Sequence, residues 1–568
     1  MRIAIIDGYI DEPTCLGVPP YISPYPRYIA GAIWDFDSKI NISYITIDQL
    51  RNEPELVNFL NENDIIIIIA GVSVPGRYLS GYPASANEIV RLIQSITEPY
   101  KFLCGPAARY GFGQGGGQLT KDIIKEQFTE IITGDPEIYV RSLLENKLST
   151  DKISNDITRK NAEEIGLYAE IGSKIVKKHP NFPDYIITEI ETYRGCPRCV
   201  TGGCSFCCEP SKGLPDFRPI NHIVNEIKHL YAQGIRNIRL GNQPCIFSYM
   251  SREAGEKEFP RPNPEAIEEL FKKIRNVAPD LKTFHIDNAN PGIIARYPDE
   301  SQRIAKTIIK YHTSGDVAAM GVESVDPVVI KENNLKADSE QVMDAIKTLN
   351  MVGRKIGQNG LPELLPGLNF VFGLKGETKK TFQMNYDFLK EILKKDLLVR
   401  RINIRQVIPI PGTEMYKTGL RNTIRHKGLF KQFKRRLKEQ IERPLLEKTI
   451  PPGSILSRVY TEKHDGKTTF GRQLGSYPIL IGIPGEISLN KYIDVKITDH
   501  GYRSITGIPV PIDINNAKRE TLQGLPGLGK KRVLRILANR PFKNISELES
   551  VMDDPEIIDK ISEILIFN

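Results

Sequence analysis

The sequence contains no hydrophobic run long enough to cross a membrane. Its longest aliphatic stretch, residues 65–72, has eight residues, whereas a spanning helix needs about 20. The opening residues, MRIAIIDGY, carry no apolar leader and no cleavage site, so we expect a cytoplasmic protein with no membrane partner. With 40% hydrophobic and 26% charged residues, the composition argues against a disordered chain, a collagen or a coiled coil.

Histidine and cysteine are scarce and unevenly placed. None of the eight histidines lies before position 179, and five of the eight cysteines fall within thirteen residues. A disulfide framework would spread cysteines over a short secreted chain. A dense cysteine loop indicates a metal site instead. Its spacing leaves both an iron–sulfur cluster and zinc open, because two C-x2-C pairs occur within 196–207.

The order of strand and helix signals predicts the domain organisation of this 568-residue chain. Strands and helices alternate over residues 1–150, which predicts an N-terminal doubly wound α/β domain. Residues 151–185 are expected to form a linker helix. Within 186–420, strand signals begin near residues 187, 235, 282, 317, 367 and 401. Each interval can hold one helix, so we predict a partial (βα)6 barrel with its active site at the carboxyl ends of the strands.

Basic charge gathers in two blocks near the C-terminus. Residues 421–448 carry ten Lys or Arg against three acids, and residues 518–543 carry eight against one. We predict a basic helix in 421–450 that ends before Pro444, a small β domain in 451–510 and a helical hairpin in 511–568. The two blocks are either solvated helix faces or contact surfaces for a polyanion such as a nucleic acid.

The cysteine loop resembles that of the radical S-adenosylmethionine (SAM) enzymes, and the resemblance covers residues 186–420. RGCP at 194–197 and CSFC at 204–207 are similar to the two halves of the family's C-x3-C-x2-C loop, with four extra residues between them. The resemblance implies a [4Fe–4S] cluster, SAM on the open iron and a 5′-deoxyadenosyl radical, with electrons from ferredoxin or flavodoxin. The implied ligands are Cys196, Cys204 and Cys207, with Cys199 as the alternative first ligand.

The later strand ends are similar to further motifs of the same family. GNQP at 241–244 stands where the family has Gly-Gly-Glu-Pro, and the Gln243 amide oxygen would accept from the SAM ammonium less strongly than a carboxylate. GVES at 321–324, GLKGET at 373–378 and PIPGTEMY at 409–416 resemble the fourth, fifth and sixth strand segments. The resemblance assigns cofactor binding to Phe206, Gly241, Asn242, Gln243, Pro244, Glu323, Ser324 and Gly373, and it assigns no catalytic residue.

The flanking regions carry weaker resemblances. The N-terminal domain is similar to cobalamin-binding or methylthiotransferase domains, but their ligands are absent, because no histidine is available and Cys15 and Cys104 are one short of three cysteines. Residues 451–510 resemble TRAM, a tRNA-binding β-barrel, and residues 511–543 resemble a helix-hairpin-helix. Its LPGLG turn implies phosphate contacts from Gly527, Gly529, Lys530, Lys531, Arg532 and Arg535.

The sequence therefore predicts a radical SAM enzyme that modifies a nucleic acid, with tRNA as the favoured partner. Methylthiolation is one candidate reaction, although the missing third cysteine argues against it. One alternative is a radical lyase or repair enzyme that acts on DNA. Another is a non-catalytic iron–sulfur or zinc protein that binds nucleic acid, and the intact GVES and GLKGET strand ends weigh against it.

Overall fold

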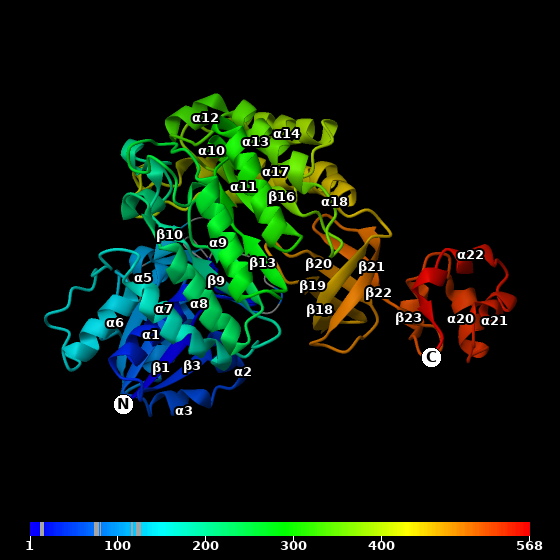
Figure 1. The fold of residues 1–568 in the computed structure, drawn as a ribbon, viewed down its shortest axis with the longest axis horizontal. Coiled ribbons are helices and arrows are strands. Elements are labelled where there is room, and N and C mark those ends of the chain that lie inside the picture. Colours follow the sequence, from blue (N-terminus) through cyan, green and yellow to red (C-terminus); the bar gives the residue numbers. More distant parts are fainter. Residues whose placement is uncertain (12–15, 73–78, 80, 115–117, 121–126) are drawn as a thin grey trace.

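The computed structural model describes residues 1–11, 16–72, 79, 81–114, 118–120 and 127–568. Cys15 lies outside the described residues. The chain runs from an N-terminal α/β unit through a large barrel and a small β-barrel to a helical unit at the opposite end of the molecule (Figure 1). Within these ranges, no helix is both long and apolar enough to span a lipid bilayer.

The N-terminal unit is a parallel five-stranded sheet in the order β3-β1-β4-β5-β8. Ligands of such doubly wound sheets bind at the carboxyl ends of the strands, where the strand order reverses. Here the reversal lies between β1 and β4. The strands are β1 (Arg2–Asp7), β3 (Asn41–Thr46), β4 (Ile65–Ile69), β5 (Tyr100–Cys104) and β8 (Glu130–Ile131).

Helices cover both faces of this sheet because its strands alternate apolar side chains between two cores. Ile3 and Ile5 face one core, whereas Ala4 and Ile6 face the other. The first core lies under α1 (Pro24–Phe36), α6 (Pro136–Glu145) and α7 (Ile165–Gly172). The second core lies under α2 (Ile47–Asn52), α3 (Leu56–Leu60), α4 (Ala86–Gln94) and α5 (Pro106–Tyr110). Helix α7, which falls within the predicted linker, packs between α1 and barrel helix α8 (Ile220–Gln233).

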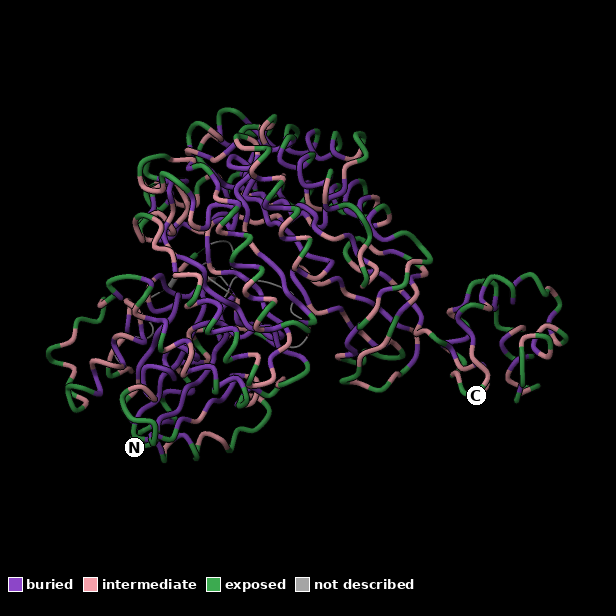
Figure 2. The backbone as a smooth tube through the Cα atoms, viewed as in Figure 1, coloured by how far each residue is buried: buried purple, intermediate pink, exposed green. Residues whose placement is uncertain are grey.

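The predicted partial barrel is confirmed, and each of its strands begins within three residues of the predicted start. Every pairing between neighbouring strands is parallel. The strands are β9 (Ile187–Glu191), β12 (Asn237–Gly241), β13 (Thr283–Ile286) continued by β14 (Asn288–Ala289), β15 (Asp316–Glu323), β16 (Leu364–Phe372) and β17 (Arg401–Gln406). After α8, the connecting helices include α9 (Pro264–Val277), α11 (Pro298–Tyr311), α13 (Ser339–Gly353) and α14 (Lys379–Lys394). Figure 2 shows the buried residues in the interior of the molecule and the exposed residues at its periphery.

The N-terminal unit and the barrel share one continuous core. Strand β2 (Tyr21–Ile22) pairs with β9 and so extends the barrel wall. Behind this wall the Glu226 carboxylate accepts hydrogen bonds from Arg27 at 2.8 Å and from Arg218 at 2.7 Å, with all three side chains fully buried. Removing one member would leave a buried charge without compensation, so these contacts fix the two units relative to each other.

The basic helix continues through Pro444, so the predicted end before this residue is wrong. Helix α17 (Lys427–Leu437) is followed by a π-helical turn at Lys438–Glu442 and then by α18 (Arg443–Thr449). A proline inside a helix lacks an N–H donor and clashes with the preceding turn. The wider π turn accommodates it and lets the helical path continue.

The C-terminal third contains a closed five-stranded barrel and a helical unit with its own apolar core. The barrel order is β18-β19-β20-β22-β21, which confirms the small β-barrel of the predicted fold class. Its strands are β18 (Ile455–Asp465), β19 (Thr468–Gln473), β20 (Leu480–Pro484), β21 (Tyr492–His500) and β22 (Ser504–Val510). The helices that follow are α19 (Arg519–Gln523), α20 (Lys530–Ala538), α21 (Ile545–Ser550) and α22 (Glu556–Asp559).

Candidate active site

The cysteine loop leaves the barrel at the carboxyl end of β9. The short antiparallel strands β10 (Tyr193–Arg194) and β11 (Asp216–Phe217) close its neck. At this neck Gly195 has φ +84°, and a Cβ there would collide with the Leu214 carbonyl. Its N–H donates to the Glu209 carboxylate at 2.9 Å. Only glycine fits this conformation and this close approach, so the neck turns the cysteines back over the barrel.

Three of the loop thiols lie close enough to influence one another. The pKa of Cys196 is raised to about 12, mainly by burial and in part by the charge of Cys204. Burial is also the main cause of the raised pKa of Cys207, to which Cys208 and Cys204 add. By contrast, the pKa of Cys199 responds only to burial and to its own backbone amide. Cys204 therefore lies within electrostatic range of both Cys196 and Cys207, and Cys199 lies on the short helical turn that follows Cys196.

Two cations face these thiols. The Arg198 guanidinium donates to Cys204 Sγ at 3.0 Å. The positive charge of Lys336 opposes the effect of burial on the pKa of Cys196 and of Cys204. Cations of this kind favour the thiolate form, which is the metal-binding form.

The donor set fits an iron–sulfur cluster better than a single ion. Within the ranges that the structure describes, no three His, Cys, Asp or Glu side chains are arranged to hold one metal ion. A structural zinc site needs four ligands converging on one point. An iron–sulfur cluster instead spreads its thiolates over separate iron atoms. A loop whose donors are thiols, with the Arg198 guanidinium bonded to Cys204, supplies the ligand type of the second arrangement.

A buried amide oxygen follows the carboxyl end of β12. Gln243 donates through Nε2 to the Leu240 carbonyl at 3.1 Å, while its Oε1 has no hydrogen-bond partner among the described residues. Asn242, with φ +53°, donates to Glu191 at 2.6 Å. A buried acceptor without a partner is unfavourable. A donor such as an ammonium group would therefore fit Gln243 Oε1.

At the end of β15 the two predicted residues behave differently. Glu323 has φ +63°, and its carboxylate lies 3.4 Å from the Lys336 ammonium. Left-handed backbone at a non-glycine residue is strained and concentrates at functional sites. Ser324 instead donates to Asn385 at 3.4 Å and accepts from the Asp326 N–H at 3.2 Å. Glu323 therefore faces the cofactor region, whereas the Ser324 hydroxyl stabilises the turn.

The remaining predicted cofactor residues frame the same end of the barrel. Gly373 donates its N–H to Glu377 at 2.7 Å, which holds the GLKGET turn. Phe206 packs against an apolar cluster that includes Cys204, Leu374 and Met415. Pro244 is half-buried directly after Gln243. All of these residues lie at carboxyl ends of strands or on the cysteine loop, as predicted.

Sequence reasoning missed the asparagine pair that holds the cysteine loop. Ser205 donates its N–H to the Asn333 carbonyl at 3.0 Å and its hydroxyl to the Asn333 side chain at 2.8 Å. Asn334 donates to the carbonyls of Thr201 and Gly203 at 3.1 and 2.9 Å. Two adjacent asparagines in a polar turn carry no signal that separates this role from ordinary turn formation.

The carboxyl edge of the N-terminal sheet covers the loop from above. Val72 and Tyr110 of that edge pack with Cys208 and with Ile410 of the PIPGTEMY segment. The ligand-binding edge of one α/β unit and the active end of the other therefore face each other. This contact buries Cys208, at the end of the loop.

The predicted phosphate contacts lie far from this site, on the C-terminal helical unit (Figure 1). Gly527 and Gly529 are exposed in the turn before α20, and Lys530 and Lys531 are exposed at its start. Arg532 is instead bound to Asp553 at 2.7 Å and to the Gly527 carbonyl at 2.9 Å. Arg535 contacts the same Asp553 at 3.4 Å. The four cations thus divide into two exposed and two paired side chains.

Comparison with known proteins agrees with this geometry. The radical SAM superfamily matches residues 190–389. An uncharacterized protein of Methanocaldococcus jannaschii is 49% identical over 512 residues, which are 89% of this chain and 93% of that protein. The tRNA-2-methylthio-N(6)-dimethylallyladenosine synthase of Rickettsia rickettsii is 24% identical over 57% of this chain and 66% of its own length. The solved radical SAM methyltransferase TsrM of Kitasatospora setae aligns with a TM-score of 0.46 and 13% identity over 73% of this chain and 76% of its own.

The cysteine loop, the strand ends and the matched residues define a radical SAM fold and site. Residues 190–389 form a radical SAM domain, and the chain is a radical SAM enzyme of a family that uses a [4Fe–4S] cluster and SAM. When bound, these cofactors supply the reductive cleavage of SAM that starts radical chemistry.

Proposed function

We propose that this radical SAM enzyme modifies a nucleic acid, with tRNA as the favoured substrate. The observation that carries the proposal is a surface groove of about 400 Å³ where the basic helix meets the small barrel. Tyr502, in the turn between β21 and β22, is 45% exposed beside it. The groove is lined by Lys431, Lys434, Arg435, Lys438, Glu439 and Tyr502. A cationic groove with an exposed aromatic ring is the usual platform for an unpaired nucleotide strand.

Two further features support the same partner. The small barrel and the hairpin around Gly527 resemble TRAM and helix-hairpin-helix modules, which bind nucleic acid. Lys530 and Lys531 remain exposed at the start of α20, where backbone N–H groups and side-chain charge favour phosphate. The printed name of the Rickettsia relative describes an enzyme of tRNA modification. Together these features favour tRNA over DNA.

We assign the cluster to Cys196, Cys204 and Cys207, because the charge of Cys204 acts on both other thiols and Cys204 is flanked by Arg198 and Lys336. Gln243 Oε1 would accept from the SAM ammonium, and Glu323 with Lys336 would lie at its polar end. The reductant would be a ferredoxin or flavodoxin. Methylthiolation is disfavoured, since Cys104 is the one described cysteine of the N-terminal unit and it is buried at the end of β5.

The proposal predicts that neutralising the groove weakens RNA binding at all sequences alike. Three substitutions, Lys431→Gln, Lys434→Gln and Lys438→Gln, should lower the slope of log affinity against log salt by roughly 2, since each phosphate contact on a single strand contributes about 0.7. Tyr502→Ala should weaken binding about tenfold through lost base stacking. Fluorescence anisotropy with total tRNA and with duplex DNA measures both effects, and deletion of residues 511–568 tests the hairpin separately.

The matched control is Lys347→Gln, which removes an exposed charge from α13, outside the groove lining. Nucleoside mass spectrometry after incubation of reconstituted enzyme with SAM, dithionite and total RNA tests the reaction itself. Unchanged affinity and salt slope in the groove variants would overturn the proposed binding surface. If the enzyme binds DNA more tightly than tRNA and modifies it, the substrate is DNA and not tRNA.

A further inference from the structure

The inner face of the barrel is cationic along β17. Arg401, Asn403 and Arg405 alternate with Ile402 and Ile404, whose side chains belong to the outer apolar core. Because successive residues of a strand point to opposite faces, the three polar side chains face the barrel interior. Asn403 confirms this orientation, since it donates at 2.8 Å to Asn369 on the adjacent strand β16.

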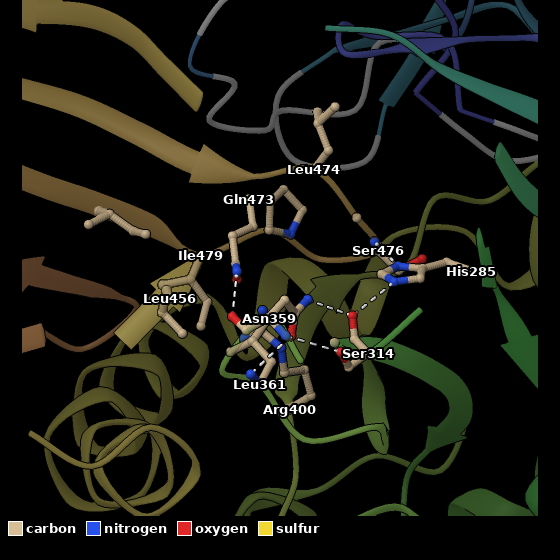
Figure 3. Close-up of a pocket in the computed structure, with 14 residues that line it drawn as sticks. His285, Ser314, Asn359, Leu361, Arg400, Leu456, Gln473, Leu474, Ser476 and Ile479 are labelled. Carbon is tan, nitrogen blue, oxygen red and sulfur yellow. Dashed lines mark hydrogen bonds between the residues drawn. The ribbon is translucent and has the colours of Figure 1, made fainter. Parts of the chain in front are cut away.

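A loop of the small β-barrel closes the amino end of this interior. The loop, residues 474–479, joins β19 to β20. The Tyr21 hydroxyl, on the strand that extends one edge of the large barrel, donates to the Gly475 carbonyl at 2.7 Å. At the other edge the Arg400 guanidinium donates to the Tyr477 carbonyl at 3.1 Å. Figure 3 shows Ser476 of the same loop beside His285, whose Nδ1 accepts the Ser476 N–H at 2.9 Å. This loop of the small barrel thus closes the large barrel at its amino end.

Tyr477 reaches from this loop into the interior. Its ring centroid lies 5.4 Å from the Arg401 guanidinium carbon. Burial raises its pKa, and the charges of Asp287 and Arg405 also influence it. The residue adopts φ +52°, a left-handed conformation that is strained for a tyrosine and that the loop must hold in place. A strained backbone conformation of this kind fixes the direction of the side chain. Here it places the phenol between β17 and the β12–β14 side of the barrel.

The arginines of the interior are not equally neutralised. Arg239 is held by Glu189 at 2.7 Å and by Asp287 at 3.5 Å. Arg401 donates to the neutral amide of Asn403 at 2.9 Å. Within the part of the chain that the structure describes, no carboxylate forms an ion pair with it, although the charge of Glu442 acts on it from a longer distance and that of Arg503 opposes it. Burial lowers its pKa, yet part of its side chain remains accessible. A desolvated guanidinium without a counter-ion is unfavourable, and a bound anion would offset that cost.

We propose that Arg401 and Tyr477 form the floor of the substrate site and bind an anionic group of the substrate, a carboxylate or a phosphate. Arg405 lies next on the same inner face, nearer the carboxyl end where the cluster and SAM would bind. The small barrel then contributes directly to substrate recognition, in addition to any contact with nucleic acid outside. This inference rests on the radical SAM chemistry of the barrel and not on the proposed nucleic acid substrate.

The test uses reconstituted full-length enzyme with inorganic phosphate and with acetate as probes, titrated calorimetrically at constant ionic strength. Arg401→Gln should weaken binding of the effective probe at least tenfold, because it removes the charge and the two-pronged donor. Tyr477→Phe removes one hydroxyl donor and should weaken it about fivefold. Arg401→Lys keeps the charge and should bind the probe with intermediate affinity.

The matched control is Arg303→Gln, which replaces an exposed arginine on α11. Selenate located by anomalous scattering in crystals distinguishes this site from the outer groove.

Stronger binding of phosphate than of acetate would identify a phosphate-bearing substrate, and the reverse would identify a carboxylate. Selenate seated on Arg401 and Tyr477 supports the proposal whichever nucleic acid the outer groove binds. Absence of selenate from the barrel interior, or equal probe affinity in the wild type, Arg401→Lys and Tyr477→Phe proteins, overturns it. Loss of RNA binding in the groove variants would not change anion binding at Arg401 and Tyr477. The experiments can therefore refute the nucleic acid proposal and the anion-site proposal independently.

Discussion

The polar groups around Asp316, at the amino end of the barrel strands, differ from those around Gln243, at the carboxyl end, in how they are held. At the amino end, Asp316 accepts from the Ile286 N–H at 3.0 Å and contacts His312 Nδ1 at 3.1 Å. Both ring nitrogens of His285 also have partners, the Ser476 N–H and the Ser314 carbonyl. At the carboxyl end, Gln243 Oε1 has no partner among the described residues and Glu323 is held in a left-handed conformation.

This difference indicates that stabilising contacts gather at one end of the barrel and the groups that would bind the cluster and SAM gather at the other. The amino end encloses a cavity of only about 10 Å³ between the two barrels, next to His285 and Ser314, which is about the smallest space that holds one water molecule. The carboxyl end combines buried thiols, an orphaned acceptor and backbone strain. In βα barrels the carboxyl end carries the chemistry and the amino end carries the stability. The following predictions test that separation.

The largest effect is expected at the cluster. Cys196→Ala, Cys204→Ala and Cys207→Ala should each remove nearly all bound iron, because a cluster held by three thiolates loses a required ligand. Cys199→Ala is the matched control within the same loop and should retain a full cluster. Iron and sulfide analysis after anaerobic reconstitution measures the outcome. A Cys196 variant with full iron beside a depleted Cys199 variant would reverse our assignment of the first ligand.

Much of this site could be predicted from the sequence because its parts are local. The cysteine loop and the strand-end motifs lie within short segments, and their order alone places them at one end of a barrel. Ser324 and Arg532 show the limit of such reasoning, because each motif residue is engaged by a partner distant in sequence, Asn385 and Asp553.

The amino end could not be predicted because its contacts join segments far apart in the chain. Tyr477 and Arg401 are 76 residues apart, and nothing local distinguishes the SYP sequence from an ordinary turn. The π turn before Pro444 was missed for a related reason, since tertiary packing overrides the usual rule that a proline ends a helix.

A smaller effect is expected on SAM affinity at Gln243. Gln243→Ala should weaken SAM binding by roughly tenfold or more, because a hydrogen bond to a charged group contributes about 1.5–3 kcal/mol. Gln243→Glu should strengthen it, since a carboxylate accepts from an ammonium more strongly than an amide does. Equilibrium dialysis of SAM with cluster-loaded protein measures both. Equal affinity in all three proteins would show that Gln243 does not contact SAM.

The smallest effect is the pH dependence of stability at the amino end. Burial lowers the pKa of His312, but its hydrogen bonds to Asp316 and Glu363 outweigh burial and raise the pKa above the ordinary 6.5. A raised pKa means that the folded state binds the proton more tightly. The stabilisation is therefore complete below about pH 6.5 and is lost as the pH rises through the folded-state pKa.

Urea unfolding of the wild type and of His312→Gln should give midpoints that differ most at about pH 5.5 and converge toward about pH 8.5. Burial lowers the pKa of His285, and the charge of His312 also lowers it, so the comparison includes a smaller change in the pH dependence contributed by His285. A constant difference across this range would mean that His312 stabilises the amino end by packing alone.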